Sequence, residues 1–333
     1  MKLKYLLIIF KSLTFRRLIN VLLIQLSFLI SRITRKSIHW GKPISISIEP
    51  TTSCNLSCPE CPSGLKQFSR PTGKITIETL DKILAELSKT LLYITFYFQG
   101  EPLLHSKFAE MVKKIKDHNI LVGTSTNAHY LNEETSNRII ESKLDRLIVS
   151  LDALDAETYT KYRRGGNFDL VIENLKKLVE IKKRKDSILP FIELQFIVFK
   201  HNQHQIDEIK KFGKDIGVNK VTIKTAQVYN YEGGNDLIPD VYSRYQKDET
   251  GKFEIKNSLP NHCFRMWSGT VFTWDGRVVP CCFDKDAQHQ FGKIGETNFS
   301  DIWNSKQYNL FRNQLLKDRK QIEICRNCSE GMK

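Results

Sequence analysis

The sequence begins with a long stretch that has no acidic residue. No aspartate or glutamate precedes Glu49, whereas nine lysines and arginines do, and these nine account for most of the net charge of +14. The rest of the 333 residues is therefore only mildly basic. The charge asymmetry belongs to a tail, and the body keeps little excess positive charge with which to bind nucleic acid, so a nucleic-acid partner is not expected.

The chain also lacks an apolar run long enough to span a bilayer. The main apolar run near its start, residues 18–30, has 13 residues, whereas a spanning helix needs roughly 20. No signal-peptidase site of small residues follows it. A basic, apolar segment is typical of proteins that lie on an anionic membrane surface. Residues 1–42 are expected to be such a membrane-associated segment or a pair of helices docked on the protein body, although their apolar residues form no clean face.

The eight cysteines lack the spread of a disulfide framework. They form a triplet at C-x3-C-x2-C spacing, an isolated cysteine, an adjacent pair and a C-x2-C pair, which in order are Cys54, Cys58, Cys61, Cys263, Cys281, Cys282, Cys325 and Cys328. Such close spacings suit metal ligation, and free thiols indicate a reducing compartment. A cytoplasmic protein is therefore expected, peripheral at the inner face of the membrane if the basic segment binds lipid.

Strand-like and helix-like segments alternate over residues 43–226. The six apolar, β-branched runs cover residues 44–49, 92–98, 120–126, 146–151, 191–199 and 221–225. Strands that alternate with helices predict parallel βαβ units, and six are too few for a closed eight-stranded barrel. We expect an α/β fold, an open partial (β/α)6 barrel. Ligand sites in such folds form at the carboxyl ends of the strands, where the cysteine triplet follows the first strand.

The composition changes after the sixth strand. Residues 227–262 are rich in glycine, proline and aspartate, which predicts a linker or loop region. Residues 270–280 predict a β-hairpin around Asp275-Gly276, and residues 300–317 predict a helix. With four further cysteines at metal-ligand spacing, residues 263–333 are expected to form a small C-terminal metal-binding domain.

The cysteine triplet can hold three irons of a four-iron cluster and leave the fourth iron open. Here the chain resembles the radical S-adenosylmethionine (SAM) enzymes that carry a C-terminal SPASM-type domain, over roughly residues 44–330. The resemblance implies that Cys54, Cys58 and Cys61 bind a [4Fe-4S] cluster whose open iron is chelated by SAM. It also implies that a flavodoxin- or ferredoxin-type reductant supplies an electron, and that SAM is cleaved to a 5′-deoxyadenosyl radical, which abstracts a substrate hydrogen.

Three strand ends resemble the SAM-binding motifs of that family. Gln99-Gly100-Glu101-Pro102 resembles its Gly-Gly-Glu-Pro motif, and an Asn-containing and a Ser-x-Asp ending follow the third and fourth strands. A strand-end carboxylate can accept hydrogen bonds from an ammonium group, and an arginine can bind a carboxylate with two hydrogen bonds. The implied SAM contacts are Gly100, Glu101, Pro102, Thr126, Asn127, Ser150 and Asp152, with Arg163 or Arg164. Two departures are Ala128, where glycine is usual, and Glu60, where many relatives carry an aromatic residue against the adenine.

The C-terminal cysteines resemble the opening of a SPASM domain, Cys263-x12-Gly276-x4-Cys281. The resemblance implies that Cys263, Cys281, Cys325 and Cys328 fully ligate one auxiliary [4Fe-4S] cluster, and a tetrahedral zinc ion is the alternative. Because few residues follow Cys328, a second auxiliary cluster is not expected. Cys282 is either a buried thiol or a hydrogen-atom donor that quenches a substrate radical, as in an epimerase. Nearby acid/base candidates are Asp275, Asp284, Asp286 and His289.

We therefore expect a radical SAM enzyme of oxidoreductase type that oxidises, epimerises or cross-links its substrate. The short segment before the first strand favours a small molecule, a saccharide or a lipid-linked glycan over a peptide, because peptide-modifying relatives often carry a leader-binding domain there. A peptide- or protein-modifying maturase is the alternative. An alternative of another class is a non-catalytic iron–sulfur or zinc protein that acts as a scaffold or electron carrier.

Overall fold

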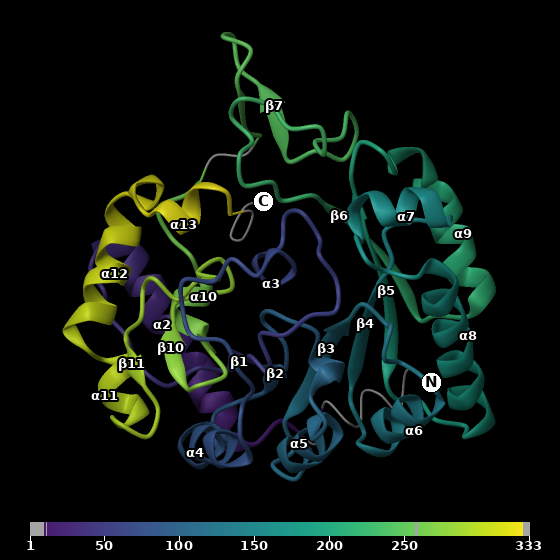
Figure 1. Cartoon of the computed structure of the whole chain (residues 1–333). Helices are drawn as coiled ribbons and strands as arrows, with labels where there is room; N and C mark the ends of the chain where they lie inside the picture. The colour runs from purple at the N-terminus through teal and green to yellow at the C-terminus, as the bar shows by residue number, and fades with distance from the viewer. Residues whose placement is uncertain (1–9, 11, 257–258, 329–333) are drawn as a thin grey trace.

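The computed structural model describes residues 10, 12–256 and 259–328. One nine-stranded sheet runs through it in the order β11-β10-β9-β1-β2-β3-β4-β5-β6 (Figure 1). The six strands that come first in the chain, β1 to β6, are all parallel, which confirms the expected α/β fold with a partial barrel. They are β1 (Ser45–Ile48), β2 (Tyr93–Thr95), β3 (Leu121–Thr126), β4 (Arg146–Ser150), β5 (Phe191–Val198) and β6 (Lys220–Thr225).

Helices line the outer side of the curved sheet, and the loop after β1 lies inside the curve (Figure 1). Their buried residues recur at helical spacing, as in Leu80, Ile83, Leu84 and Leu87. Asn and Asp side chains at several N-caps accept hydrogen bonds from the first turn. These helices are α4 (Ile77–Leu87), α5 (Phe108–Lys116), α6 (Glu133–Glu141), α7 (Ala156–Tyr162), α8 (Phe168–Arg184) and α9 (Ile206–Ile216), with short turns η1 (Pro102–Leu104) and η2 (Gln203–Gln205).

The C-terminal part extends the same sheet beyond β1. Strand β9 (Gly269–Phe272) pairs in parallel with β1, so that Ser45 faces Gly269 and Ile48 faces Phe272. Strand β10 (Arg277–Val279) returns antiparallel to β9 and then pairs with β11 (Gly292–Lys293). The predicted hairpin is therefore present, and it shares a sheet with the partial barrel. The accompanying helices are α10 (Arg265–Ser268), α11 (Phe299–Trp303), α12 (Lys306–Lys317), η3 (Arg319–Gln321) and α13 (Glu323–Arg326).

Two further elements lie outside the sheet. The segment expected as a linker contains an antiparallel pair, β7 (Tyr245–Lys247) and β8 (Phe253–Ile255). Near the N-terminus, α2 (Phe15–Thr34) lies beside the C-terminal part (Figure 1). There Phe28 packs against Phe264 and Trp267 with ring centroids 5.2 and 5.3 Å away. The first and last thirds of the chain are thus in direct contact.

Candidate active site

The cysteine loop follows β1 and crosses the inner mouth of the curved sheet. Ser57 donates its amide hydrogen to the carbonyl of Arg164 at 2.9 Å, which ties the loop to the segment after α7. Cys61 donates its amide hydrogen to the carbonyl of Cys58 and precedes the short helix α3 (Pro62–Leu65). As a result, the thiols of Cys54, Cys58 and Cys61 line one cavity of about 160 Å³.

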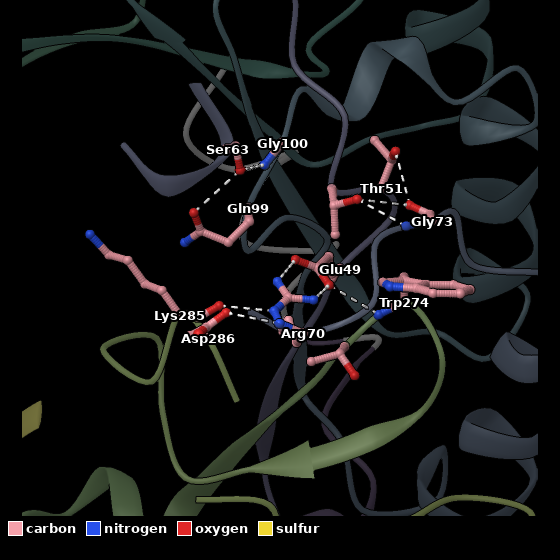
Figure 2. Close-up of polar contacts among 12 residues, drawn as sticks. Glu49, Thr51, Ser63, Arg70, Gly73, Gln99, Gly100, Trp274, Lys285 and Asp286 are labelled. Atoms are coloured by element: carbon pink, nitrogen blue, oxygen red, sulfur yellow. Dashed lines mark hydrogen bonds and ion pairs between the residues drawn. The ribbon is translucent and has the colours of Figure 1, made fainter. Parts of the chain in front are cut away.

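Gly100 allows the end of β2 to pass close to this loop. Its φ of 73° lies in the left-handed region, and a Cβ atom there would come within 2.2 Å of the carbonyl oxygen of Thr51. The Gly100 amide donates to the hydroxyl of Ser63 at 2.8 Å, as Figure 2 shows. The next amide, that of Glu101, donates to the carbonyl of Ser53 at 2.8 Å. A side chain at position 100 would separate the two segments.

Glu101 connects two strand ends to the cysteine loop. Its buried carboxylate accepts hydrogen bonds from the Thr126 hydroxyl at 2.7 Å and from the amides of Asn127 and Leu103 at 2.8 and 3.1 Å. Burial raises the pKa of this carboxyl group, although these donors partly oppose the shift. The amide group of Asn127 then donates to the side-chain oxygen of Asn55 at 2.8 Å. The Gly-Glu motif therefore positions both β3 and the cysteine loop.

Of the two arginine candidates, Arg163 faces the cavity and Arg164 is exposed. The guanidinium of Arg163 binds the carboxylate of Asp152 through Nε at 2.7 Å and Nη2 at 2.5 Å. Burial lowers the pKa of Arg163, but Asp152 and the thiol of Cys58 outweigh this effect and raise it well above its usual value. Arg163 is thus a permanent cation beside the thiols.

The structure gathers most of the predicted SAM contacts around the three thiols. The cavity is lined by Gly100, Glu101, Thr126, Asn127, Ser150 and Arg163. Two other predicted contacts do not line it. Asp152 supports Arg163, and Pro102 is the first residue of η1.

Glu60 has another role than the aromatic residue of many relatives. Its carboxylate accepts a hydrogen bond from the amide of Tyr229 at 2.9 Å and one from Asn235 at 3.4 Å. The residue therefore connects the cysteine loop to the segment after β6. This contact joins residues far apart in the chain, so the sequence pattern does not predict it.

Three of the four C-terminal cysteines, Cys263, Cys325 and Cys328, lie near a buried arginine, and Cys281 lies near Cys263 and Cys325. Cys263 and Cys281 line a cavity of about 270 Å³ between β1, β9 and α10, and the amide of Cys328 donates to the carbonyl of Cys325 at 3.1 Å. The guanidinium of Arg319, only 1% exposed, donates to the sulfur of Cys328 at 3.4 Å. Burial lowers the pKa of Arg319, but the surrounding thiols raise it and prevail. Sequence reasoning missed Arg319 because it stands among other cations, in Lys317-Asp318-Arg319-Lys320, where no local signal singles out one side chain.

Lys285 lies near thiols of both groups of cysteines, those of Cys61 and Cys282. The guanidinium of Arg265 lies 3.7 Å from the Cys282 sulfur. Lys285 extends away from the ion pair of Arg70 in Figure 2, and its ammonium lies 4.7 Å from the ring centroid of Tyr229. Burial lowers the pKa of Lys285, while Cys61 and Cys282 oppose the decrease.

The other predicted acid/base candidates have structural partners. Asp284 accepts the amides of Gln288 and His289, and Asp275 forms an ion pair with Arg277 at 3.0 Å. His289 contacts Glu323 at 3.0 Å. Asp286 accepts hydrogen bonds from Ser69. It also accepts one from the Arg70 amide, which Figure 2 shows. These side chains hold turns and segment contacts.

The family model for the radical SAM superfamily matches residues 48–222, which is more than half of the chain. The chain belongs to the radical SAM superfamily. A second model, the SPASM iron–sulfur cluster-binding domain, matches residues 263–329. Both matches confirm the resemblance of the sequence motifs. A radical SAM protein with a SPASM domain is expected to bind SAM and a [4Fe-4S] cluster, and its SPASM domain is expected to bind additional iron–sulfur cluster.

Curated relatives of this radical SAM chain act on different molecules. It is 28% identical over 312 residues to a tungsten-containing aldehyde ferredoxin oxidoreductase cofactor-modifying protein of Pyrococcus furiosus, with 85% of this chain and 86% of the relative covered. It is 23% identical over 302 residues to a PqqA peptide cyclase of Bradyrhizobium diazoefficiens, with 82% and 76% covered.

Solved structures share the fold at low identity. BtrN in complex with AdoMet and 2-DOIA has a TM-score of 0.53 and 20% identity, with 87% of this chain and 94% of BtrN covered. Native anSMEcpe with bound AdoMet has a TM-score of 0.61 and 17% identity, with 85% and 89% covered.

The residues of this radical SAM protein fit the groups that the family implies. Burial raises the pKa of the Cys54 thiol to about 11 and raises that of Cys58, so a cationic metal centre would offset the cost of forming thiolates there. Among the described residues, no three His, Cys, Asp or Glu side chains converge tightly enough to hold a single metal ion. The fit therefore rests on the shared position and burial of the thiols.

Proposed function

We propose that this chain is a radical SAM enzyme that holds a [4Fe-4S] cluster through Cys54, Cys58 and Cys61. When bound, the cluster would supply an electron, taken from a flavodoxin- or ferredoxin-type reductant, for the cleavage of SAM to methionine and a 5′-deoxyadenosyl radical, and this radical would take a hydrogen atom from the substrate. The observation that supports this function is the single cavity that three thiols share with Arg163 and the ends of β2, β3 and β4.

The chain's own residues have distinct tasks in this proposal. Arg163, oriented by Asp152, would bind the SAM carboxylate through charge-assisted hydrogen bonds. The turn around Gly100 and Glu101 would offer oxygen atoms to the SAM ammonium group, and Asn127 and Ser150 would position the ribose. The buried side of the cavity would exclude water from the reacting atoms.

Cys263, Cys281, Cys325 and Cys328 would fully ligate one auxiliary [4Fe-4S] cluster. Arg319 supports this assignment because a buried cation stabilises neighbouring thiolates. A fully ligated cluster would transfer electrons or brace the fold and would leave no iron for substrate.

The inner wall of the sheet favours a small, hydroxyl-rich substrate such as a saccharide. Side chains at alternate positions of a strand share one face, and Tyr97, Ser125, Ser150 and Ile197 line the thiol cavity. On the same face, the guanidinium of Arg146 and the hydroxyl of Thr222 bind Glu193 at 2.5 and 2.6 Å. BtrN, whose structure contains 2-DOIA, has 94% of its chain covered. An oxidation or epimerisation of such a molecule is the proposed reaction class.

A peptide substrate is the second candidate. PqqA peptide cyclases are among the curated relatives, and matching structures include SuiB bound to the precursor peptide SuiA and anSMEcpe with the Kp18Cys peptide. A peptide would lie along a separate cavity of about 300 Å³ that is lined by Tyr229 and Lys285, both of which lie near Cys61.

The decisive experiment for the enzyme function uses SAM alone. The reconstituted full-length protein, reduced with dithionite, should convert SAM to 5′-deoxyadenosine and methionine. The test variant is Arg163→Gln, because the Arg163 side chain lines the cavity of the thiols. The matched control is Arg164→Gln, because Arg164 is exposed. We expect cleavage in wild type and Arg164→Gln and a strong loss in Arg163→Gln. No 5′-deoxyadenosine from a protein with full iron content would leave a scaffold or electron carrier as the function.

For Cys282 we propose a hydrogen-atom donor role, because it lies next to Arg265 and close to Lys285 and Tyr97. The thiol would transfer its hydrogen atom to a substrate radical, and the resulting thiyl radical would be reduced by one electron and one proton from the reductant and solvent. Cys282→Ala should retain SAM cleavage. Once a substrate is known, product formation by this variant at the wild-type rate would refute the role.

A further inference from the structure

Helix α2 turns its polar side toward the protein and its apolar side toward solvent. Four of its five buried residues are polar, namely Arg17, Asn20, Ser27 and Ser31, and the fifth is Ile24; none is more than 5% exposed. Apolar side chains at helical spacing share the opposite face. The exposed ones are Phe15, Leu18, Ile19, Leu22, Leu23, Leu26, Leu29 and Ile33. The apolar residues that form no clean face in the linear sequence thus gather on one side of the helix.

Arg17 holds the first half of α2 in this orientation. Its guanidinium donates to four carbonyl oxygens, those of Ser12 at 2.7 Å, Asn119 and His118 at 2.8 Å, and Ser88 at 2.9 Å. The last three carbonyls lie at the C-terminal ends of α4 and α5, where the helix dipole favours a cation. Turning the apolar face inward would break all four hydrogen bonds.

The middle and the end of α2 are held in the same way. Asn20 exchanges two hydrogen bonds with the backbone of Lys42 at 2.7 and 2.8 Å. The hydroxyl of Ser31 donates to the carbonyl of Ile38 at 2.8 Å and accepts from its amide at 2.9 Å. Phe28 packs against Trp267. Specific contacts along the whole length therefore leave the outer face uncovered among the described residues.

The charged side chains of α2 and of the residues just after it are all positive. Arg16, Arg32, Arg35 and Lys36 are exposed, and no acidic residue occurs before Glu49. Arg16 and Arg32 lie along the helix at the two borders of the apolar face, where long cationic side chains can reach lipid phosphates. If a second copy of the chain covered the same face, two sets of like charges would be brought together.

We propose that the outer face of α2 docks on an anionic phospholipid membrane, with the helix lying in the plane of the interface. The uncharged run of 13 residues is too short to cross a membrane, but α2 as a whole has 20 residues and is long and apolar enough by length and composition. However, its polar face is hydrogen-bonded to the body along its length, so α2 stays at the surface. The apolar side chains enter the boundary between headgroups and acyl chains, and the flanking cations contact the lipid phosphates.

The test is sedimentation of the full-length protein with vesicles of phosphatidylcholine alone or mixed with phosphatidylglycerol. The variant Leu22→Gln/Leu26→Gln/Leu29→Gln removes three exposed apolar side chains, and Leu170→Gln/Val241→Gln changes exposed apolar residues on other parts of the protein. We expect binding to the anionic vesicles by wild type and by the control. The triple variant should bind roughly tenfold or more weakly, because apolar burial drives insertion. Arg16→Gln/Arg32→Gln should weaken binding by roughly fivefold per charge.

Two results would overturn the proposal. One is that the wild-type protein, shown to be folded by near-ultraviolet circular dichroism, does not sediment with anionic vesicles, or that the triple variant sediments with them as well as wild type does. The other is that the wild-type protein does not bind lipid and is a dimer in analytical ultracentrifugation, whereas the triple variant is a monomer. In that case α2 is a protein interface. Neither result bears on SAM cleavage.

Discussion

Glu49 and Arg70 form a two-pronged ion pair next to the cysteine loop. The guanidinium nitrogens lie 2.9 and 2.6 Å from the two carboxylate oxygens, and both side chains are almost fully buried (Figure 2). The Trp274 amide donates to the same carboxylate at 3.2 Å, and Arg70 Nε donates to the Lys285 carbonyl at 3.0 Å. The pair therefore joins the end of β1 to the segment between β9 and β10, which contains Trp274, and to the segment between β10 and β11, which contains Lys285.

Replacing Arg70 by methionine should destabilise the protein strongly. Glu49 would remain buried without its partner, which costs about 3–5 kcal/mol. Thermal and denaturant unfolding would measure this loss. Adding Glu49→Gln should recover part of it, because the uncompensated charge is removed.

The matched control is Arg138→Met, which removes an exposed ion pair with Glu134. Exposed pairs contribute about 0–1 kcal/mol, so the control should unfold close to wild type. Equal losses in Arg70→Met and Arg138→Met would show that the buried pair does not stabilise the fold.

Gly100→Ala should displace the cysteine loop. Its new Cβ atom would collide with the Thr51 carbonyl at 2.2 Å, and positive φ adds strain of about 1–2 kcal/mol. Gly251→Ala is the control, because Gly251 also has a positive φ of 83° but has no atom within 4 Å of the added Cβ. We expect Gly251→Ala to lose stability only, whereas Gly100→Ala should also lose iron and SAM cleavage. Similar iron contents in the two variants would contradict this contact.

Two sets of cysteine substitutions should each remove one cluster. Replacing Cys54, Cys58 and Cys61 by alanine should remove about half of the iron and all SAM cleavage, since one of two four-iron clusters is lost. Replacing Cys263, Cys281, Cys325 and Cys328 by alanine should remove the iron of the other cluster and leave the iron that Cys54, Cys58 and Cys61 bind. Iron analysis and electron paramagnetic resonance of the reduced proteins would measure this. Zinc in place of iron after the first substitution would identify the second site as a zinc site.

His39 should make the protein sensitive to mild acid. Burial and the neighbouring Arg312 lower the pKa of His39 to about 3, and Nδ1 has no hydrogen-bond partner among the described residues. The unfolded chain takes up a proton near pH 6.5, so stability is complete above that pH and falls below it, by about 2 kcal/mol at pH 5.

The comparison of unfolding at pH 7 and pH 5 would measure this effect. His39→Gln can keep the hydrogen bond to the Trp267 carbonyl and should reduce the acid sensitivity. His118→Gln, at an exposed position, should retain it. An unchanged acid sensitivity in His39→Gln would contradict the prediction.

The spacing of the cysteines and the alternation of strands and helices were readable from the sequence because both are local properties. Three thiols within eight positions must share one loop, and strand ends must lie at one edge of a parallel sheet. The alternation predicted the partial barrel, the Asp275-Gly276 turn predicted the hairpin, and the resemblance to the family's strand-end motifs implied that Glu101 and Ser150 lie near Cys54. Arg163 was one of two local candidates, and only the direction of the chain after α7 separated it from Arg164.

Contacts between distant segments were decided by the tertiary structure. Arg70 meets Glu49 and Trp274, Arg319 meets the thiol of Cys328, and Lys285 lies near Cys61, because packing brings these segments together. The same holds for α2. Its sequence determines that it is basic and apolar, but polar groups on α4 and α5 determine which side faces the protein. Arg17 gains four hydrogen bonds there, and the apolar side chains are left outside.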